Sequence, residues 1–238
     1  MNLVIDIGNT KTKIGYFKED RLASSETFDS LPELNHFLES KATDSAIISS
    51  VNVPYEDILK ILTNVKSPLL LTHQTPLPFK NQYKSKTIGL DRIAAVAGAQ
   101  ILYPTKNVLA IDMGTCITYE LLEKGKTYLG GAISPGLFMR FKSMHNFTAR
   151  LPLVKPEPIS DLIANNTHDA INNGVVLGIK AEVEAYIQEV GTIYPALTTL
   201  ITGGDAKFFE SKIKAPIFAI PELVLVGLNA ILRYNASL

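Results

Sequence analysis

The chain has 238 residues, 46% hydrophobic and 19% charged, and its 23 basic and 23 acidic residues give a formal net charge of zero. This length corresponds to one or two domains, the zero balance argues against a basic surface that binds nucleic acid, and the single cysteine, Cys116, excludes an internal disulfide and a cysteine-based zinc site. No stretch approaches the ~20 apolar residues of a membrane span, and Asp6 and Lys11 interrupt any signal-peptide core, so we expect a globular, cytoplasmic protein.

The first half of the chain alternates predicted strands and helices. Residues 2–7 are apolar and β-branched, which predicts a buried strand that enters a tight turn at Gly8. Ser30, Pro32 and Glu33 have the spacing of a helix start. The further predicted strands cover residues 11–17, 21–28, 45–51 and 68–72, and the predicted helices cover about 32–40, 55–65 and 91–103. Between them, the polar, lysine-rich residues 73–88 predict a functional loop.

The second half repeats the pattern of the first. Residues 4–10 and 108–115 each contain an apolar strand, then Asp-x-Gly, then a hydroxyl residue. The two aspartates, Asp6 and Asp112, are 112 − 6 = 106 residues apart, which favours a duplicated small domain over a solenoid repeat. Further predicted elements are a strand over 127–133, helices over 136–146 and 167–190, a strand over 197–201 and a closing helix over 222–234. We expect two lobes, residues 1–104 and 105–238, that share a cleft.

The first Asp-x-Gly turn has the residues of a phosphate-binding hairpin. Gly8 lacks a Cβ, so a ligand can approach its backbone closely, and the amides and side chains of Asn9 and Thr10 can surround a phosphate. Lys13 can reach a phosphate oxygen, and Asp6 can hold a metal ion directly or through water. A single such turn is more often an ordinary hairpin.

A second copy of this turn favours phosphate binding over an ordinary hairpin. Residues 112–118 read Asp-Met-Gly-Thr-Cys-Ile-Thr, with Gly114 and Thr115 at the positions of Gly8 and its neighbour. Two such turns that face one cleft would hold a polyphosphate from both sides, and the two carboxylates would hold the accompanying cations. This pairing is the strongest functional signal that the residues themselves give.

Gly89-Leu-Asp91-Arg92 comes directly before the most apolar predicted helix. At a helix start the dipole keeps a carboxylate ionised, so Asp91 can accept a proton from an alcohol. Arg92 can bind a substrate carboxylate with two parallel hydrogen bonds. The alternative, a helix cap followed by a surface arginine, remains open on these residues alone.

Six motifs occur in the order found in the type III pantothenate kinases, and the sequence resembles that family from Asp6 to about Gly227. The motifs are Asp6-x-Gly8-Asn9-Thr10, Gly89-x-Asp91-Arg92, Asp112-x-Gly114-Thr115-x-x-Thr118, Gly130-Gly131-Ala132-Ile133-x-Pro135-Gly136, Asn166-Thr167-x-x-Ala170-Ile171 and Gly203-Gly204-Asp205. The resemblance implies an α/β, actin-like (ASKHA) fold, in which two ribonuclease-H-like lobes surround a nucleotide cleft. It also implies ATP-dependent phosphorylation of pantothenate to 4′-phosphopantothenate, the first step of coenzyme A biosynthesis.

The resemblance also assigns roles to single residues. Asp91 corresponds to the proton acceptor and Asp112 to a ligand of the monovalent cation, K⁺ or NH₄⁺. ATP would contact Asp6, Gly8, Asn9, Thr10, Lys13, Gly114 and Thr115, with Mg²⁺ held near Asp6 through water. Pantothenate would contact Tyr83, Gly89, Asp91, Arg92 and Thr167. The implied protein is a homodimer whose small-molecule partners are ATP and pantothenate, with no role for nucleic acid or a membrane.

Three alternatives to a pantothenate kinase remain open. The chain could be another small-molecule kinase of the same fold, although Gly89-x-Asp91-Arg92 and Asn166-Thr167 match pantothenate-contacting positions. It could be a non-catalytic regulatory protein that senses a metabolite, although the retained Asp6, Asp91 and Asp112 argue against this. A nuclease of ribonuclease-H type would need a basic groove, which the zero net charge does not support. The fold alone cannot separate these functions, so the site residues decide.

Overall fold

A computed structural model describes residues 1–238 except for 40, 42, 52 and 86. The chain forms two compact units. The first contains Met1–Thr105, Leu122–Gly130 and Glu222–Leu238, and the second contains Lys106–Leu121 and Gly131–Pro221. No helix among the described residues is long and apolar enough to cross a membrane.

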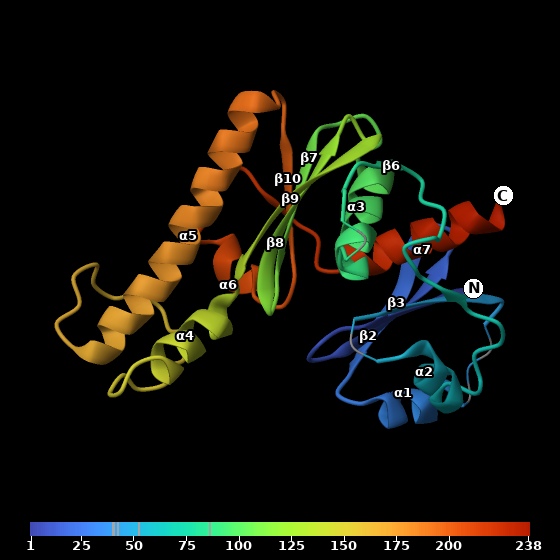
Figure 1. Ribbon diagram of the computed structural model, residues 1–238, viewed down its shortest axis with the longest axis horizontal. Coiled ribbons are helices and arrows are strands. Elements are labelled where there is room, and N and C mark those ends of the chain that lie inside the picture. Colours follow the sequence, from blue (N-terminus) through green and yellow to red (C-terminus); the bar gives the residue numbers. More distant parts are fainter. Residues whose placement is uncertain (40, 42, 52, 86) are drawn as a thin grey trace. The chain divides into compact units, whose positions relative to one another are not determined.

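The first unit is built on a five-stranded sheet of order β3-β2-β1-β4-β5 (Figure 1). The strands are β1 (Asn2–Ile7), β2 (Thr12–Lys18), β3 (Arg21–Phe28), β4 (Ser45–Ser50) and β5 (Leu69–Leu70). β1 pairs antiparallel with β2 and β2 with β3, whereas β4 joins β1 in parallel and β5 joins β4 in parallel. The three strands predicted over residues 2–7, 11–17 and 21–28 therefore form an antiparallel meander.

Helices cover both faces of this sheet. They are α1 (Leu31–Leu38), α2 (Tyr55–Ile61), α3 (Leu90–Leu102) and α7 (Leu223–Ala236). Leu3 and Ile5 of β1 belong to a core cluster with residues of α1 and α2. The side chain of Asn2, which alternation places on the opposite face, donates a hydrogen bond to Asn229 of α7 at 3.0 Å.

The helices α3 and α7 pack backbone against backbone (Figure 1). A Cβ on Gly227 of α7 would lie 1.7 Å from the carbonyl oxygen of Ala94 in α3. A Cβ on Gly98 of α3 would lie 2.3 Å from the carbonyl oxygen of Leu223. The small residues that the sequence places in this segment therefore have a packing role, because any side chain at these two positions would push the helices apart.

The second sheet, most of which belongs to the second unit, repeats the strand order of the first sheet. Its strands are β7 (Val108–Met113), β8 (Cys116–Glu123), β9 (Thr127–Pro135), β10 (Thr198–Thr202) and β11 (Phe218–Ala219), in the order β9-β8-β7-β10-β11. As in the first sheet, the fourth strand joins the first in parallel and the fifth joins the fourth in parallel. The short strand β6 (Lys80–Asn81) extends this sheet by pairing with residues 127–128 of β9, which belong to the first unit.

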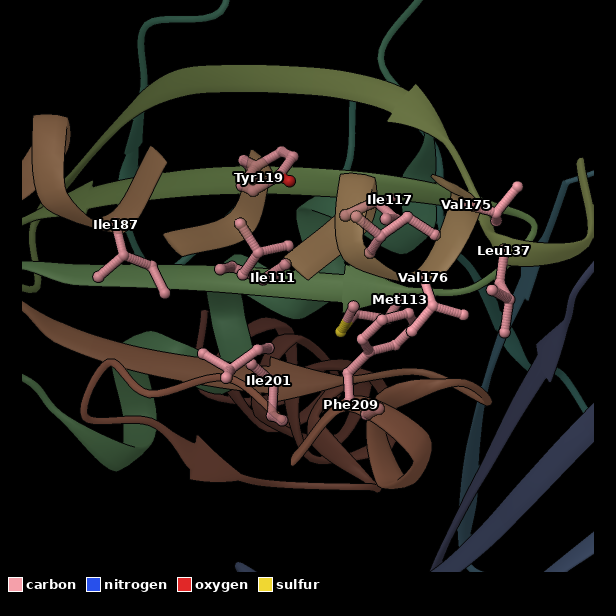
Figure 2. Close-up of a cluster of buried hydrophobic side chains, with 14 of the residues drawn as sticks. Ile111, Met113, Ile117, Tyr119, Leu137, Val175, Val176, Ile187, Ile201 and Phe209 are labelled. Carbon is pink, nitrogen blue, oxygen red and sulfur yellow. The ribbon is translucent and has the colours of Figure 1, made fainter. Parts of the chain in front are cut away.

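Three helices complete the second unit: α4 (Leu137–Asn146), the 27-residue α5 (Thr167–Ile193) and α6 (Ala206–Glu210). Their apolar residues form one core cluster with the strands. Figure 2 shows part of that cluster, with Ile111 and Tyr119 on the strands, Val175 and Val176 on α5, and Phe209 on α6. The core thus fixes α5 and the strand ends that carry the polar turns described below.

The structure differs from the predicted elements mainly where packing sets an element's length. The helix predicted over 55–65 ends at Ile61, because the residues that follow form isolated backbone turns instead of continuing the helical hydrogen bonds. The helix predicted over 32–40 ends at Leu38, and residue 40 lies outside the described residues. The elements α6, β11 and β6 were not predicted, because each has only two to five residues and carries no periodic pattern.

The compact units also divide the chain differently from the predicted lobes of 1–104 and 105–238. The closing helix α7 packs on α3 and on the first sheet, so the end of the chain returns to the first unit. The hairpin end Leu122–Gly130 also belongs to the first unit. Such returns depend on which apolar faces meet, and no composition change in the sequence marks them.

The contact between α3 and α7 gives a stability prediction. We expect Gly227→Ala to lower the free energy of unfolding by about 1–3 kcal/mol or more, because the added Cβ overlaps a backbone carbonyl. The control is Gly174→Ala in the exposed interior of α5, where a Cβ meets nothing within 4 Å. It should stabilise the protein by roughly 0.5–1 kcal/mol. Urea unfolding measures both, and equal stability of Gly227→Ala and wild type would contradict the close helix contact.

Candidate functional site

In the first unit, the β1–β2 turn carries five of the predicted site residues. Asp6, the penultimate residue of β1, pairs in register with Lys13 of β2. The Gly8 amide donates to the Lys11 carbonyl at 3.1 Å, and a Cβ on Gly8 would lie 3.1 Å from that same oxygen. Asn9 and Thr10 are exposed at the tip. The hairpin is therefore tight, with its amide-bearing tip accessible to a ligand.

The start of α3 explains the identity of Gly89. This residue is the N-cap of the helix, and Asp91 lies in the first turn. The Oδ1 atom of Asp91 accepts a hydrogen bond from the Arg92 amide at 2.8 Å. A Cβ on Gly89 would lie only 2.3 Å from Oδ1, so glycine makes room for the carboxylate in this orientation.

Arg92 is buried, with 5% of its surface exposed. Its guanidinium donates to the hydroxyl of Tyr83 at 3.4 Å and to that of Tyr128 at 3.3 Å. The two tyrosine rings stack with centroids 6.0 Å apart, and the Arg92 Cζ lies 5.2 Å from the Tyr83 centroid. The structure thus brings Tyr83, from the predicted loop 73–88, to Arg92. It also excludes the alternative of a surface arginine.

Tyr128 was not predicted from the sequence. It is fully buried in β9, and a tyrosine within an apolar strand is indistinguishable from an ordinary core residue. Its contact with Arg92 depends on a pairing of segments that lie 36 residues apart, which no local signal reveals.

In the second unit, the β7–β8 turn follows an aspartate placed as in the first turn but is shorter, because only Gly114 and Thr115 separate β7 from β8. Asp112 is the penultimate residue of β7 and pairs with Thr202 of β10, as Asp6 pairs with Ser49 of β4. The Gly114 amide donates to the Cys116 carbonyl at 3.0 Å, and Thr115 is exposed. The sequence repeat therefore places the two aspartates alike on their strands, although the turns that follow differ in length.

Two glycines from other elements lie directly against this turn. A Cβ on Gly136, the N-cap of α4, would lie 2.2 Å from the Gly114 carbonyl oxygen, and the Gly136 amide donates to Thr115 at 3.2 Å. Gly203 has a φ of +95°, and its Cβ would lie 2.4 Å from Oδ1 of Asp112. The backbones of these two glycines therefore pack directly against the turn, and a side chain on either glycine would displace the turn.

Asp205 follows Gly203 and Gly204 at the start of α6. Its amide donates to the Met113 carbonyl at 2.9 Å, which ties α6 to the end of β7. Its side chain makes no capping hydrogen bond, although it occupies the N-cap position. Burial raises the pKa of its carboxyl above the ordinary value.

A polar network behind the turn was also absent from the sequence predictions. Glu182 of α5 accepts hydrogen bonds from the hydroxyls of Tyr119, at 2.8 Å, and Ser134, and it forms an ion pair with Arg140. Arg140 Nε donates to the Pro135 carbonyl at 2.9 Å. Burial opposes the ionisation of Glu182, but these hydrogen bonds outweigh it and lower its pKa. Burial, followed by the contact with Glu182, raises the pKa of the Tyr119 phenol far above its ordinary value.

Thr167, the remaining predicted site residue, is the first residue of α5 and is exposed. The preceding residue, Asn166, caps the helix by accepting from the Asp169 amide at 3.0 Å. Hydrogen bonds from Asn166 and His168 lower the pKa of Asp169. The predicted residues thus lie at two places in the first unit, the β1–β2 turn and the start of α3, and at two places in the other unit, the β7–β8 turn and the start of α5.

Metal-binding side chains do not cluster in the part of the chain that the structure describes. Within it, no group of three or more His, Cys, Asp or Glu residues could hold a metal ion. A cation at Asp6 or Asp112 would thus take most of its ligands from backbone oxygens, water or a bound phosphate, as Mg²⁺ does with nucleotides.

Comparison with known proteins gives a consistent family. Residues 2–189 match a family model described as Type III pantothenate kinase. A relative from Christiangramia forsetii with the name "Type III pantothenate kinase" is 45% identical, and the alignment covers all of both chains.

Solved structures with the same fold include a conserved Baf family protein from Campylobacter jejuni, with a TM-score of 0.66 at 24% identity over 99% of this chain and 100% of that one. They also include a ROK family glucokinase from Streptomyces griseus in complex with glucose and AMPPNP. Its TM-score is 0.53 at 13% identity, over 98% of this chain and 99% of that one. With the repeated strand order, these similarities confirm the predicted α/β, actin-like fold.

The Glu182 network gives a pH prediction. The folded-state pKa of Glu182 lies below its unfolded value, so its ionised form contributes stability above about pH 4.5, and this contribution is lost as the pH falls through the folded-state pKa. We expect Glu182→Gln to be less stable than wild type by about 1–3 kcal/mol at pH 7. The difference should shrink as the pH falls below 5.

Thermal unfolding of both proteins across this pH range measures the difference. Glu189→Gln, at an exposed position of the same helix, serves as the control and should show little change. A stability difference between wild type and Glu182→Gln that stays constant from neutral to acid pH would contradict the role of the ionised carboxylate.

Proposed function

This chain belongs to the type III pantothenate kinase family, and on that premise we propose that it transfers the γ-phosphate of ATP to pantothenate. The product is 4′-phosphopantothenate, and the reaction is the first step of coenzyme A biosynthesis. The observation that carries the proposal is the match to relatives with this name along the whole chain. The two similar Asp-x-Gly turns, one in each unit, support it through their chemistry.

We assign the phosphates of ATP to these two turns. In the first, the tip residues Asn9 and Thr10 offer exposed amides, and Lys13 supplies a positive charge beside Asp6. In the second, Gly114 leaves the backbone open, and the exposed Thr115 offers a hydroxyl and an amide. Phosphoryl transfer needs little covalent chemistry from the protein, so holding the phosphates in line with the acceptor supplies most of the acceleration.

We assign pantothenate to the start of α3. Asp91 would orient the primary hydroxyl and take its proton as the bond to phosphorus forms. The fixed orientation of its carboxylate over Gly89 supports this role, since a positioned base needs a single geometry. Arg92, whose guanidinium is held by Tyr83 and Tyr128, would face the pantothenate carboxylate with its charge largely desolvated, and Thr167 would contact the substrate through its hydroxyl.

Two cations belong to the proposed reaction. Oδ1 of Asp112 and the carbonyl oxygen of Met113 lie near each other beside Gly203, since a Cβ on this glycine would be 2.4 and 2.5 Å from them. A carboxylate oxygen and a carbonyl oxygen in such proximity suit K⁺ or NH₄⁺. Asp6 would hold Mg²⁺ through water while ATP supplies the other ligands. When bound, the cations neutralise the charge that develops on the transferred phosphoryl group.

We further propose that the enzyme works in the cytoplasm as a homodimer. Large apolar side chains are exposed on the end of β9, on α4 and on the segment that follows it. They are Ile133, Phe138, Met139, Phe147, Leu153, Leu162 and Ile163. Exposed apolar side chains that form a contiguous patch typically mark a protein interface, and we propose that these residues form such a patch. A second copy of the chain is the partner that the family resemblance implies.

The function and the monovalent cation can be tested in one experiment. ADP release is measured with ATP and Mg²⁺, with and without pantothenate, in potassium buffer and in sodium buffer. We expect turnover only with pantothenate and potassium together. Equal rates in both buffers would contradict the cation assignment at Asp112. ATP binding without pantothenate-dependent turnover would instead favour a different acceptor or a regulatory protein.

The role of Asp91 gives a sharper prediction. Asp91→Asn should lower kcat by ~10²-fold or more, the scale expected for loss of a general base. Gly89→Ala should also lower kcat while the fold is retained, because the added Cβ forces the Asp91 carboxylate out of its present orientation. Asp57→Asn, in the exposed first turn of α2, is the matched control and should be fully active. Near-normal turnover of Asp91→Asn would remove Asp91 from this role.

The proposed dimer surface can be tested by sedimentation. Ile163→Glu, at a side chain that is 84% exposed, should raise the dimer dissociation constant by about tenfold or more. Ile193→Glu, 69% exposed at the other end of α5, should leave the dimer intact. A monomeric wild type, or equal dissociation constants for the two variants, would contradict the proposed surface.

A further inference from the structure

The polar network around Glu182 is connected by a short path to the second phosphate turn. Arg140 Nε holds the carbonyl of Pro135, and the next residue, Gly136, donates its amide to the carbonyl of Thr115. The peptide group between Pro135 and Gly136 therefore contacts the Arg140 guanidinium through its carbonyl and the turn through its amide. Because a Cβ on Gly136 would overlap the Gly114 carbonyl oxygen, a small shift of this peptide must move the turn.

The guanidinium of Arg140 is itself held in place by Glu182. Arg140 forms an ion pair with Oε2 of Glu182, while Oε1 accepts from Tyr119 and Ser134. Glu182 therefore has fixed partners on β8, β9 and α4. The helix that carries it is anchored by its neighbours Ile179 and Val183, which are fully buried in the core of the second unit. Arg140 is thus held by a residue of the rigid helix α5, and precise positioning of a site requires support from such an element.

We propose that Glu182 and Arg140 are positioning residues for the nucleotide, acting through Pro135 and Gly136 on the Gly114–Thr115 turn. The proposal rests on the proposed function, because it takes this turn as an ATP-phosphate contact. Neither residue touches the nucleotide in this role. Loss of the pair loosens the turn and weakens the hold on ATP, whereas the pantothenate residues of α3 are unaffected.

The test compares three variants with wild type. Glu182→Gln keeps an acceptor for Tyr119 and Ser134 but removes the charge that holds Arg140. Arg140→Lys keeps the charge but replaces two separated donor nitrogens by one, so the contacts to Pro135 and Glu182 cannot both persist in their present geometry. Glu184→Gln is the matched control: it also removes an ion pair from α5, the pair of Glu184 with Lys180 at 2.7 Å, and the other partner that the described residues give Glu184 is the Lys214 amide at 2.7 Å, which is not part of the turn.

Five quantities are measured for each protein: the Kd of ATP by calorimetry without acceptor, the KM for ATP, the KM for pantothenate, kcat, and the melting temperature. For Glu182→Gln and Arg140→Lys we expect the Kd and KM for ATP to rise by about tenfold, a size typical of a displaced contact. The KM for pantothenate should stay within about twofold of wild type, because its contacts are unchanged. Glu184→Gln should bind ATP as wild type does.

A merely structural role would give a different pattern. If the first two variants bind ATP as tightly as wild type, or if the KM values for both substrates rise equally while Glu184→Gln behaves likewise, the proposal is overturned. Calorimetry separates this result from failure of the proposed function. A wild type that binds ATP but does not phosphorylate pantothenate refutes the reaction, and the ATP affinities of the variants still decide the positioning role. A wild type that does not bind ATP refutes both.

Discussion

The direct backbone contact between α3 and α7 is the constraint on which the first unit depends. Gly98 and Gly227 remove the side chains that would separate the helices, so the last helix of the chain packs on one that begins at residue 90. The contact fixes the axis of α3, and the start of α3 carries Asp91 and Arg92. The position of the candidate proton acceptor is therefore set by a helix–helix contact rather than by the loop that precedes it.

Glycine has the same function at the candidate phosphate turns. At Gly136 and Gly203 the missing Cβ lets α4 and β10 approach carbonyl and carboxylate oxygens of the second turn to within van der Waals distance. At Gly89 it makes room for the carboxylate of Asp91. These positions exclude side chains for different local reasons, yet each places backbone where a polar group must be oriented.

The two units place an aspartate alike at the end of the first strand, but different residues surround the turn that follows. Both sheets have the same strand order, and in both an aspartate occupies the penultimate position of the first strand beside the parallel fourth strand. The first turn is held by the hydrogen bond from the Gly8 amide to the Lys11 carbonyl, by the ion pair of Lys11 with Asp29, and by the Val51 amide, which donates to the Ile7 carbonyl at the end of β1. The second turn is additionally enclosed by Gly136, Gly203 and the amide of Asp205.

The sequence by itself determined the duplicated Asp-x-Gly turns, most of the longer strands and helices, and the candidate residues Asp6, Asp91 and Asp112. These features are local: a turn, a cap or a periodic apolar face is encoded within a few residues. Tertiary structure alone decided the burial of Arg92 against Tyr83 and Tyr128, the network of Glu182, Arg140 and Tyr119, and the return of α7 to the first unit. Each of these joins segments far apart in the chain, where pairing depends on which surfaces pack together, and no short sequence pattern records that choice.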